Sequence, residues 1–194
     1  KEGLEICHQL SDQVRLTTLW NNMGIFKDEV GDWPGAIEAY EQALSQAEQL
    51  GNADFQINIA NNIAFLNLKQ GLHDAALSRL QQSQALADQH DLPIYKAHVQ
   101  SNLADLYIRQ QAIPSAETAL TKAEALAEQV QWEEELARIY RSWAQLHLLK
   151  QDITQALHHA ERAVKLAQDL GMPLEVGASL RVLGQAQAAN NQPQ

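Results

Sequence analysis

Three groups of residues carry side chains that could do chemistry: Cys7, the histidine pair at 158–159 and the acidic run at 133–135. Adjacent helical residues point about 100° apart, so the two histidines cannot face one metal ion. The cysteine falls in a column of small residues that recurs along the chain, which favours a packed thiol over a nucleophile. Carboxylates suit the start of a helix, so the acidic run is predicted to be solvated and not an acid/base pair. No nucleophile, base and orienting group converge, which predicts a protein that is not an enzyme and holds no metal or cofactor.

The composition excludes several classes of protein. The chain has 194 residues, 14 Lys+Arg against 24 Asp+Glu, a net charge of −10 and 45% hydrophobic residues. That apolar content is too high for a disordered tail, and no run of about 18 apolar residues could span a membrane. The negative balance disfavours nucleic acid, and one cysteine excludes an internal disulfide. We expect a folded cytoplasmic protein that binds no nucleic acid and no membrane. The opening KEGLEICHQL, without Met or a signal-peptide core, indicates a piece of a longer protein.

The elements that must position these side chains follow an internal repeat of 40 residues. One column of the repeat contains only small residues, namely Gly24, Ala64, Ala104, Ala144 and Gly184. Two further columns read Cys7, Ala47, Ala87, Ala127, Ala167 and Ala36, Ala76, Ala116, Ala156. A fourth holds large residues, Met23, Ile63, Leu103, Trp143 and Leu183. Small columns let helices approach closely and large ones fill the space between them, so Trp20, Tyr140 and Trp143 are predicted to be core residues.

Each period contains two helices, because apolar residues recur at helical spacing and helix-breaking residues divide them. Asp32 is a predicted N-cap with Pro34 in the first turn, and Gly71 follows a predicted helix end. The predicted helices cover residues 1–10, 12–30, 33–50, 53–70, 72–90, 93–110, 113–130, 132–150, 152–170 and 173–189. We therefore predict an all-α, right-handed α-solenoid of antiparallel helix pairs, with four full repeats plus a half repeat at each end.

The predicted domain organisation is a single solenoid over residues 1–194. Residues 1–11 form the second helix of a truncated repeat, 172–190 a final helix and 191–194 a tail. The four full repeats lie at 12–51, 52–91, 92–131 and 132–171.

These repeats resemble the tetratricopeptide repeat, whose pattern places an aromatic, Leu-Gly and Tyr on the first helix and Ala, an aromatic and Ala on the second. The first full repeat matches best, with Trp20, Met23-Gly24, Gly31-Asp32, Ala36, Tyr40 and Ala43. Lys27 stands where the family has Tyr, and the period is 40 instead of the usual 34. Long repeats of this kind are similar to those of bacterial signal-transduction ATPases, transcription regulators and quorum-peptide receptors.

The resemblance implies that ligands bind in a concave groove formed by the first helices of the repeats. The positions that match the family's groove residues here are Asn21, Asn22, Ile25, Asn58, Asn61, Asn62, Phe65, Lys69, His98, Asn102, Asp105, Arg109, Arg138, Arg141, Gln145 and Arg181, with Ile108, Leu148, Leu149 and Gln185 beside them. Asparagine dominates the first half of this predicted groove and arginine the second. Asparagine amides can bind a peptide backbone, whereas arginine forks to a carboxylate. The asparagines could instead bond within the repeats, and the arginines could be solvated surface.

One specific ligand of the family is disfavoured. The clamp for chaperone C-terminal tails needs Lys and Asn, then Asn, then Lys and Arg on three successive repeats. Of the five matching positions here, only Asn102 and Arg138 fit.

The predicted function is a protein- or peptide-binding scaffold module of a larger regulatory protein, with a partner that carries an acidic segment. Reversing Arg138 and Arg141 to Glu is expected to weaken binding without unfolding the protein, on the assumption that both side chains are solvated. Two alternatives stay open: an effector-sensing arm that gates a neighbouring ATPase or DNA-binding domain, and homodimerisation through the solenoid ends.

Overall fold

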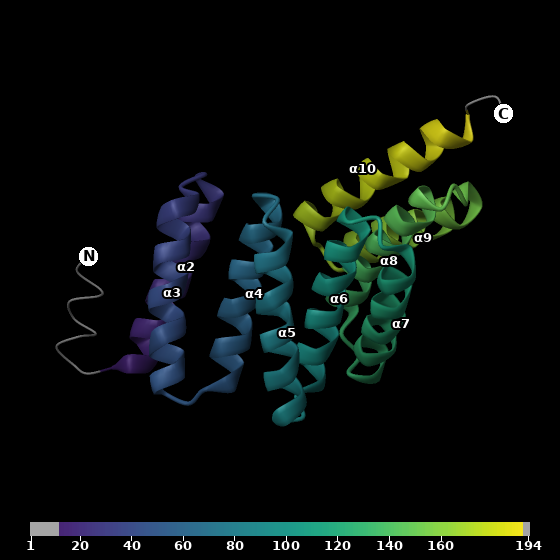
Figure 1. Cartoon of the computed structure of the whole chain (residues 1–194). Helices are drawn as coiled ribbons and strands as arrows, with labels where there is room; N and C mark the ends of the chain where they lie inside the picture. The colour runs from purple at the N-terminus through teal and green to yellow at the C-terminus, as the bar shows by residue number, and fades with distance from the viewer. Residues whose placement is uncertain (1–11, 192–194) are drawn as a thin grey trace. The chain divides into compact units, whose positions relative to one another are not determined.

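The computed structural model describes residues 12–191, which form nine α-helices and no strand (Figure 1). Their bounds are α2 Gln13–Glu29, α3 Trp33–Gln49, α4 Ala53–Lys69, α5 His73–Gln89, α6 Pro93–Arg109, α7 Ile113–Gln129, α8 Glu133–Leu149, α9 Ile153–Asp169 and α10 Pro173–Asn190. The all-α repeat fold predicted from the sequence is confirmed for this part of the chain. The predicted helix at 1–10, the packing of Cys7 and the end of the tail lie outside the described residues.

The predicted helix boundaries hold to within a residue or two, because capping residues set them. Asp32 accepts a hydrogen bond from the backbone N–H of Gly35 at 3.1 Å, and Asp152 accepts one from Gln155 at 3.2 Å. Each satisfies a backbone donor that has no partner inside its helix. Prolines occupy the first turns of α3, α7 and α10, where their missing N–H costs nothing.

The turns between helices repeat as regularly as the helices do. In each turn from α2 to α10, the residue two positions past the helix end has a left-handed backbone, with φ of 63° at Gly51 and 56° at Gln131. In each turn the next N–H bonds back five residues, as Asn52 does to the carbonyl of Ala47 at 3.1 Å. This is the Schellman ending of a helix. It leaves three residues in each turn between the described helices and therefore no long loop for a site.

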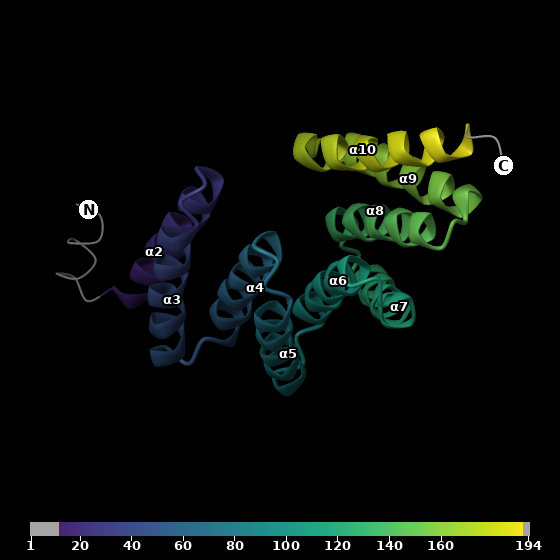
Figure 2. The same cartoon turned by 45° about the horizontal axis from the view of Figure 1, so that its top comes forward.

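By the density of their contacts the residues divide into two compact units, 1–95 and 96–194. Within unit 1, α2 packs on α3 and α4 on α5, and α4 also contacts α2 and α3 (Figure 2). Within unit 2, α7 packs on α8, α8 on α9, and α10 on both α8 and α9. The two units are each a stack of helix pairs.

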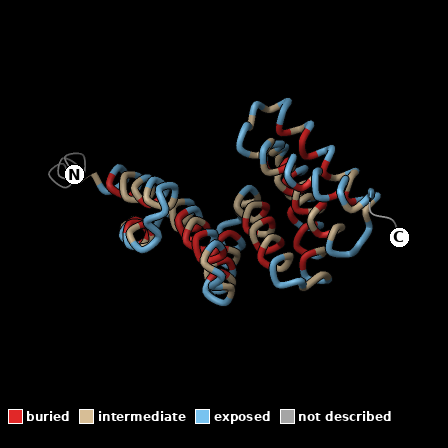
Figure 3. Tube along the Cα trace, turned by 90° about the horizontal axis from the view of Figure 1, so that it is seen from above, coloured by how far each residue is buried: buried red, intermediate tan, exposed pale blue. Residues whose placement is uncertain are grey.

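The columns of the repeat are the packing contacts, and buried residues follow the helix sides that face one another (Figure 3). Both alanine columns are fully buried: Ala47, Ala87, Ala127 and Ala167, and Ala36, Ala76, Ala116 and Ala156. Tyr140 is buried, while Trp20 is partly buried against the core of unit 1. Gly184 departs from its column, because it is exposed and a Cβ there would meet nothing within 4 Å.

Candidate ligand-binding cavity

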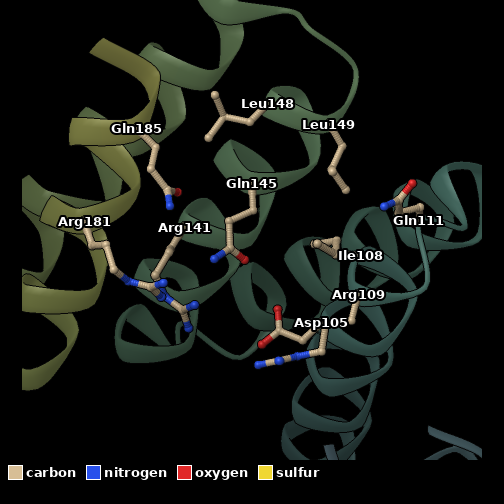
Figure 4. A pocket seen from close by; sticks show the side chains of 10 residues that line it. All are labelled: Asp105, Ile108, Arg109, Gln111, Arg141, Gln145, Leu148, Leu149, Arg181 and Gln185. Carbon is tan, nitrogen blue, oxygen red and sulfur yellow. The ribbon is translucent and has the colours of Figure 1, made fainter. Parts of the chain in front are cut away.

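Unit 2 contains a cavity of about 440 Å³ between three helices that come first in their repeats, α6, α8 and α10 (Figure 4). We call it the arginine cavity. Its lining residues are Asp105, Ile108, Arg109, Gln111, Arg141, Gln145, Leu148, Leu149, Arg181 and Gln185. All but Gln111 belong to the groove positions predicted from the sequence. The helical repeat brings them together because equivalent positions of successive first helices lie side by side.

The three arginines of this cavity differ in how they are held. Arg141 Nε donates to Glu175 Oε1 at 2.6 Å, and its side chain is only 16% exposed. Burial alone would lower the pKa of the Arg141 guanidinium, but the carboxylates of Asp105 and Glu175 raise it above its ordinary value. Arg141 is therefore a fixed charge in the cavity wall, and its predicted place on a solvated surface is wrong.

Arg109 and Arg181 are exposed, and within residues 12–191 no ion pair or hydrogen bond holds either guanidinium. Asp105, the one acidic lining residue, accepts a hydrogen bond from Ser142 Oγ at 2.6 Å. Two of the three cationic groups are thus free to pair with an anion that enters the cavity, where apolar side chains and glutamine amides lie beside them.

Glu135 is the residue that differs most from its predicted surroundings. Its side chain is 1% exposed, and its Oε2 lies 3.3 Å from His98 Nδ1 and 3.1 Å from Arg138 Nη1. Burial would raise the pKa of Glu135, but the hydrogen bond and charge of His98 and the charge of Arg138 hold it below its ordinary value. The acidic run is therefore not wholly solvated. Arg138 and His98 pair with this carboxylate and do not line the arginine cavity.

In unit 1 several of the predicted groove residues bind one another. Asn62 Nδ2 donates to Asn21 Oδ1 at 3.0 Å, which links α4 to α2. Lys69 Nζ lies 2.7 Å from Asp28 Oδ2 and 4.8 Å from the centre of the Phe65 ring. These bonds join neighbouring repeats, whereas the sequence suggested bonds within a repeat as the alternative to ligand binding.

The other predicted groove residues of unit 1 fall into two groups. Asn61 is 2% exposed, and neither amide atom has a hydrogen-bond partner, so it does not present its amide to a ligand. Asn22, Ile25, Asn58 and Phe65 are exposed on α2 and α4. In unit 2, Asn102 is partly buried on α6 and lies outside the arginine cavity.

One lining residue of the arginine cavity and one residue that holds its wall were missed from the sequence. Gln111 lies in the turn after α6, whereas the predicted groove positions are all helical. Glu175, at the start of α10, holds Arg141, and an acidic residue 34 positions after an arginine gives no sign of that contact.

His159 packs among aromatic rings, with its ring centre 5.3 Å from that of His147 and 5.9 Å from that of Trp143. Burial, together with the neighbouring His147, His158 and Arg162, lowers the pKa of His159 to about 4. Across residues 12–191 no three His, Cys, Asp or Glu side chains gather to hold a metal ion. None of the helices in that range has the length and apolar character that a membrane crossing needs.

Residues 15–89 match the family model for the tetratricopeptide repeat. No curated protein matches the chain in sequence. Tetratricopeptide repeats are in general modules of protein–protein interaction, and the match supports this general role.

Three solved structures share the fold. BtubC (BKLC) from P. vanneervenii is 20% identical with a TM-score of 0.79, over 97% of this chain and 80% of that one. A STAND signal-transduction ATPase with a tetratricopeptide repeat sensor from Pyrococcus horikoshii is 19% identical with a TM-score of 0.66, over 89% of this chain but only 26% of that one. Kinesin light chain-like, nearly identical TPR-like repeats from Podosopora anserina are 20% identical with a TM-score of 0.68, over 94% and 89%.

At sequence identities of 19–20%, these similarities show only that the fold is shared. They extend the helical-repeat architecture to the part of the chain that the family model does not match. Residues 15–89 are thus similar in sequence to the tetratricopeptide repeat family, and the 40-residue columns with their buried alanines continue the same helical-repeat fold through the rest of the described chain.

Proposed function

We propose that this chain is a protein-binding module whose arginine cavity holds an acidic segment of a partner protein. The observation that carries the proposal is the convergence of Arg109, Arg141 and Arg181 on one cavity in a chain whose net charge is −10. Arg141 is already neutralised by Glu175, so Arg109 and Arg181 supply the unpaired charge.

The other lining residues favour a peptide over a simple inorganic anion. Ile108, Leu148 and Leu149 offer an apolar surface, and the amides of Gln145 and Gln185 can donate to and accept from a peptide backbone. A segment with alternating aliphatic and acidic side chains would use both kinds of surface. Charge pairing would give orientation and salt dependence, and apolar contact would add affinity.

The test is calorimetry with a capped hexapeptide of alternating leucine and aspartate, compared with the same peptide carrying asparagine for aspartate. We expect the acidic peptide to bind and the asparagine peptide to bind about fivefold to thirtyfold more weakly, since two charge pairs near a surface are together worth on the order of 1–2 kcal/mol. Raising the salt concentration should weaken only the acidic peptide.

A pair of matched double variants locates the site. Arg109→Gln with Arg181→Gln removes the two unpaired cavity charges, and Lys122→Gln with Lys165→Gln removes two exposed charges on α7 and α9. Both variants have the same net charge, so only the first should lose the preference for aspartate. Equal losses in the two variants would mean that the peptide senses overall charge and would overturn the proposal.

A second candidate, a sensing arm that gates a neighbouring domain, draws on the likeness to the ATPase with a repeat sensor, of which this chain spans 26%. It predicts that the longer protein has an ATPase or DNA-binding domain whose activity changes when the acidic segment binds. Unchanged activity on saturation would exclude it. Self-association stays a prediction, to be tested by sedimentation at micromolar concentration.

A further inference from the structure

Unit 1 has a second cavity, of about 200 Å³, away from the predicted groove residues. We call it the serine cavity. It lies between α3, α4 and α5 and is lined by Leu44, Glu48, Gln56, Ile57, Ala60, Arg79, Gln82, Ser83 and Leu86. Leucines, Ile57 and Ala60 form apolar walls, and the exposed Glu48 and Gln82 mark its mouth. None of these residues belongs to the predicted groove or lines the arginine cavity.

The repeat itself shows what the serine cavity lacks. Two periods further along the chain, Gln56, Ala60, Gln82 and Leu86 correspond to Leu136, Tyr140, Arg162 and Leu166, which line an equivalent recess in the fourth repeat. There Tyr140 stands where the second repeat has Ala60. The first repeat has Trp20 at the same position, packed against the core. The second repeat alone among the four full repeats has a side chain no larger than a methyl group.

The fourth repeat also shows how a tyrosine is held there. Tyr140 is buried, its hydroxyl accepts a hydrogen bond from Arg162 Nη2 at 2.6 Å, and the Arg162 guanidinium carbon lies 3.8 Å from the ring centre. In the second repeat the equivalent of Arg162 is Gln82, and the ring is absent. The first and fourth repeats thus place an aromatic ring at this position, the third has Gln100, and the second leaves the space open.

Ser83 places a polar group in the cavity wall, and its state indicates a ligand. It is 2% exposed, it lines the cavity, and its Oγ has no hydrogen-bond partner. The other three repeats have Ala43, Ala123 and Ala163 in this column, so helix packing does not require a hydroxyl. An unpaired buried hydroxyl is costly, and a ligand with a donor or acceptor at that depth would remove the cost.

We propose that the serine cavity binds a tyrosine side chain of a partner protein, with its ring in the place that Tyr140 fills in the fourth repeat and its hydroxyl bonded to Ser83 Oγ. The cavity is smaller than the 300–1,000 Å³ typical of sites for drug-sized ligands, which favours a single side chain. Tyrosine is also among the commonest anchors at protein interfaces.

The first experiment uses p-cresol, the side-chain analogue of tyrosine, and toluene, which lacks the hydroxyl, titrated into the ¹⁵N-labelled protein. Amide shifts should centre on Ile57, Ala60 and Ser83, and p-cresol should bind more tightly. Ser83→Ala should weaken p-cresol about fivefold, the loss expected for one hydrogen bond, and leave toluene unchanged. The absence of shifts at these residues, or equal p-cresol affinity in the variant, would overturn the proposal.

Two further experiments test where the probe binds and whether the ligand is a tyrosine side chain or a free phenol. Ala60→Tyr supplies the missing ring from within the chain, so it should abolish binding of both probes and raise the melting temperature. A filled variant that still binds p-cresol equally well would mean that the probe lies elsewhere. The capped peptides Gly-Tyr-Gly and Gly-Leu-Gly then test the source: if p-cresol binds but the tyrosine peptide does not, the cavity takes a free phenol and the partner side chain is rejected.

Discussion

Replacing Gly24 with alanine should destabilise unit 1, because the side chain of Tyr40 occupies the space that a Cβ needs. An ideal Cβ on Gly24 would lie 2.4 Å from Cδ1 and 2.5 Å from Cε1 of that ring. Carbon atoms prefer separations of about 3.5–4.0 Å, so ring and helix would have to part by more than about 1 Å. Tyr40 is buried within the core of unit 1 and cannot turn aside.

The size of the effect follows from two opposing contributions. Overpacking of this kind costs about 1–3 kcal/mol, and replacing a helical glycine by alanine returns about 1 kcal/mol or less. A net loss of about 1–2 kcal/mol is therefore expected for Gly24→Ala. Gly184 is the matched control, since it occupies the same column of the repeat but its Cβ would meet nothing within 4 Å. Gly184→Ala should stabilise its helix by about 0.5–1 kcal/mol.

Urea unfolding measures the stability change of each variant, and hydrogen exchange shows which helix is affected. Repeat proteins unfold partly repeat by repeat, so exchange rates in α2 and α10 localise each change. We expect faster exchange in α2 for the first variant and slower exchange in α10 for the second. Shifts of the same sign in both would refute the claim that the column packs as described.

Three further predictions concern the repeat. Ala127→Arg should unfold unit 2 or cost several kcal/mol, whereas Ala125→Arg, at an exposed position of the same helix, should be neutral in a thermal melt. The pKa of histidine is about 6.5 in the unfolded chain, and that of His159 in the fold is about 4. The free energy of unfolding should therefore fall by about 1–3 kcal/mol as the pH drops from about 6.5 to about 4. In acid titrations followed by circular dichroism, His159→Phe should reduce that fall. Gln131→Gly should raise stability by up to about 1 kcal/mol in urea unfolding, because Gln131 has a φ of 56°.

The helices could be predicted from the sequence because their signals are local. A cap such as Asp32, a left-handed turn residue and an apolar period each act within a few residues, and the 40-residue repeat supplies several independent copies. The buried alanine columns follow from the same repeat, since a position that is small in every copy has no room for more.

The states of the polar side chains could not be predicted in the same way. Arg141 and Arg181 occupy one column, yet Glu175 of the next helix pairs with Arg141, and no described helix offers Arg181 an equivalent carboxylate. Glu135 is buried because His98 and Arg138 lie beside it, and His98 comes from a different helix. Pairing between helices depends on rotamers and side-chain reach, which a column of residue types does not contain.

The proposal that the arginine cavity binds an acidic segment is tested most directly by locating the contact of an acidic peptide on the protein. The side-chain Nε–Hε NMR signals of the arginines report that contact. On adding the leucine–aspartate peptide, the signals of Arg109 and Arg181 should shift with a common dissociation constant. Those of Arg15 and Arg79, on unit 1, should stay in place. Shifts confined to unit 1, or saturation of the peptide with Arg109 and Arg181 unmoved, would contradict the proposal that the arginine cavity is the binding site.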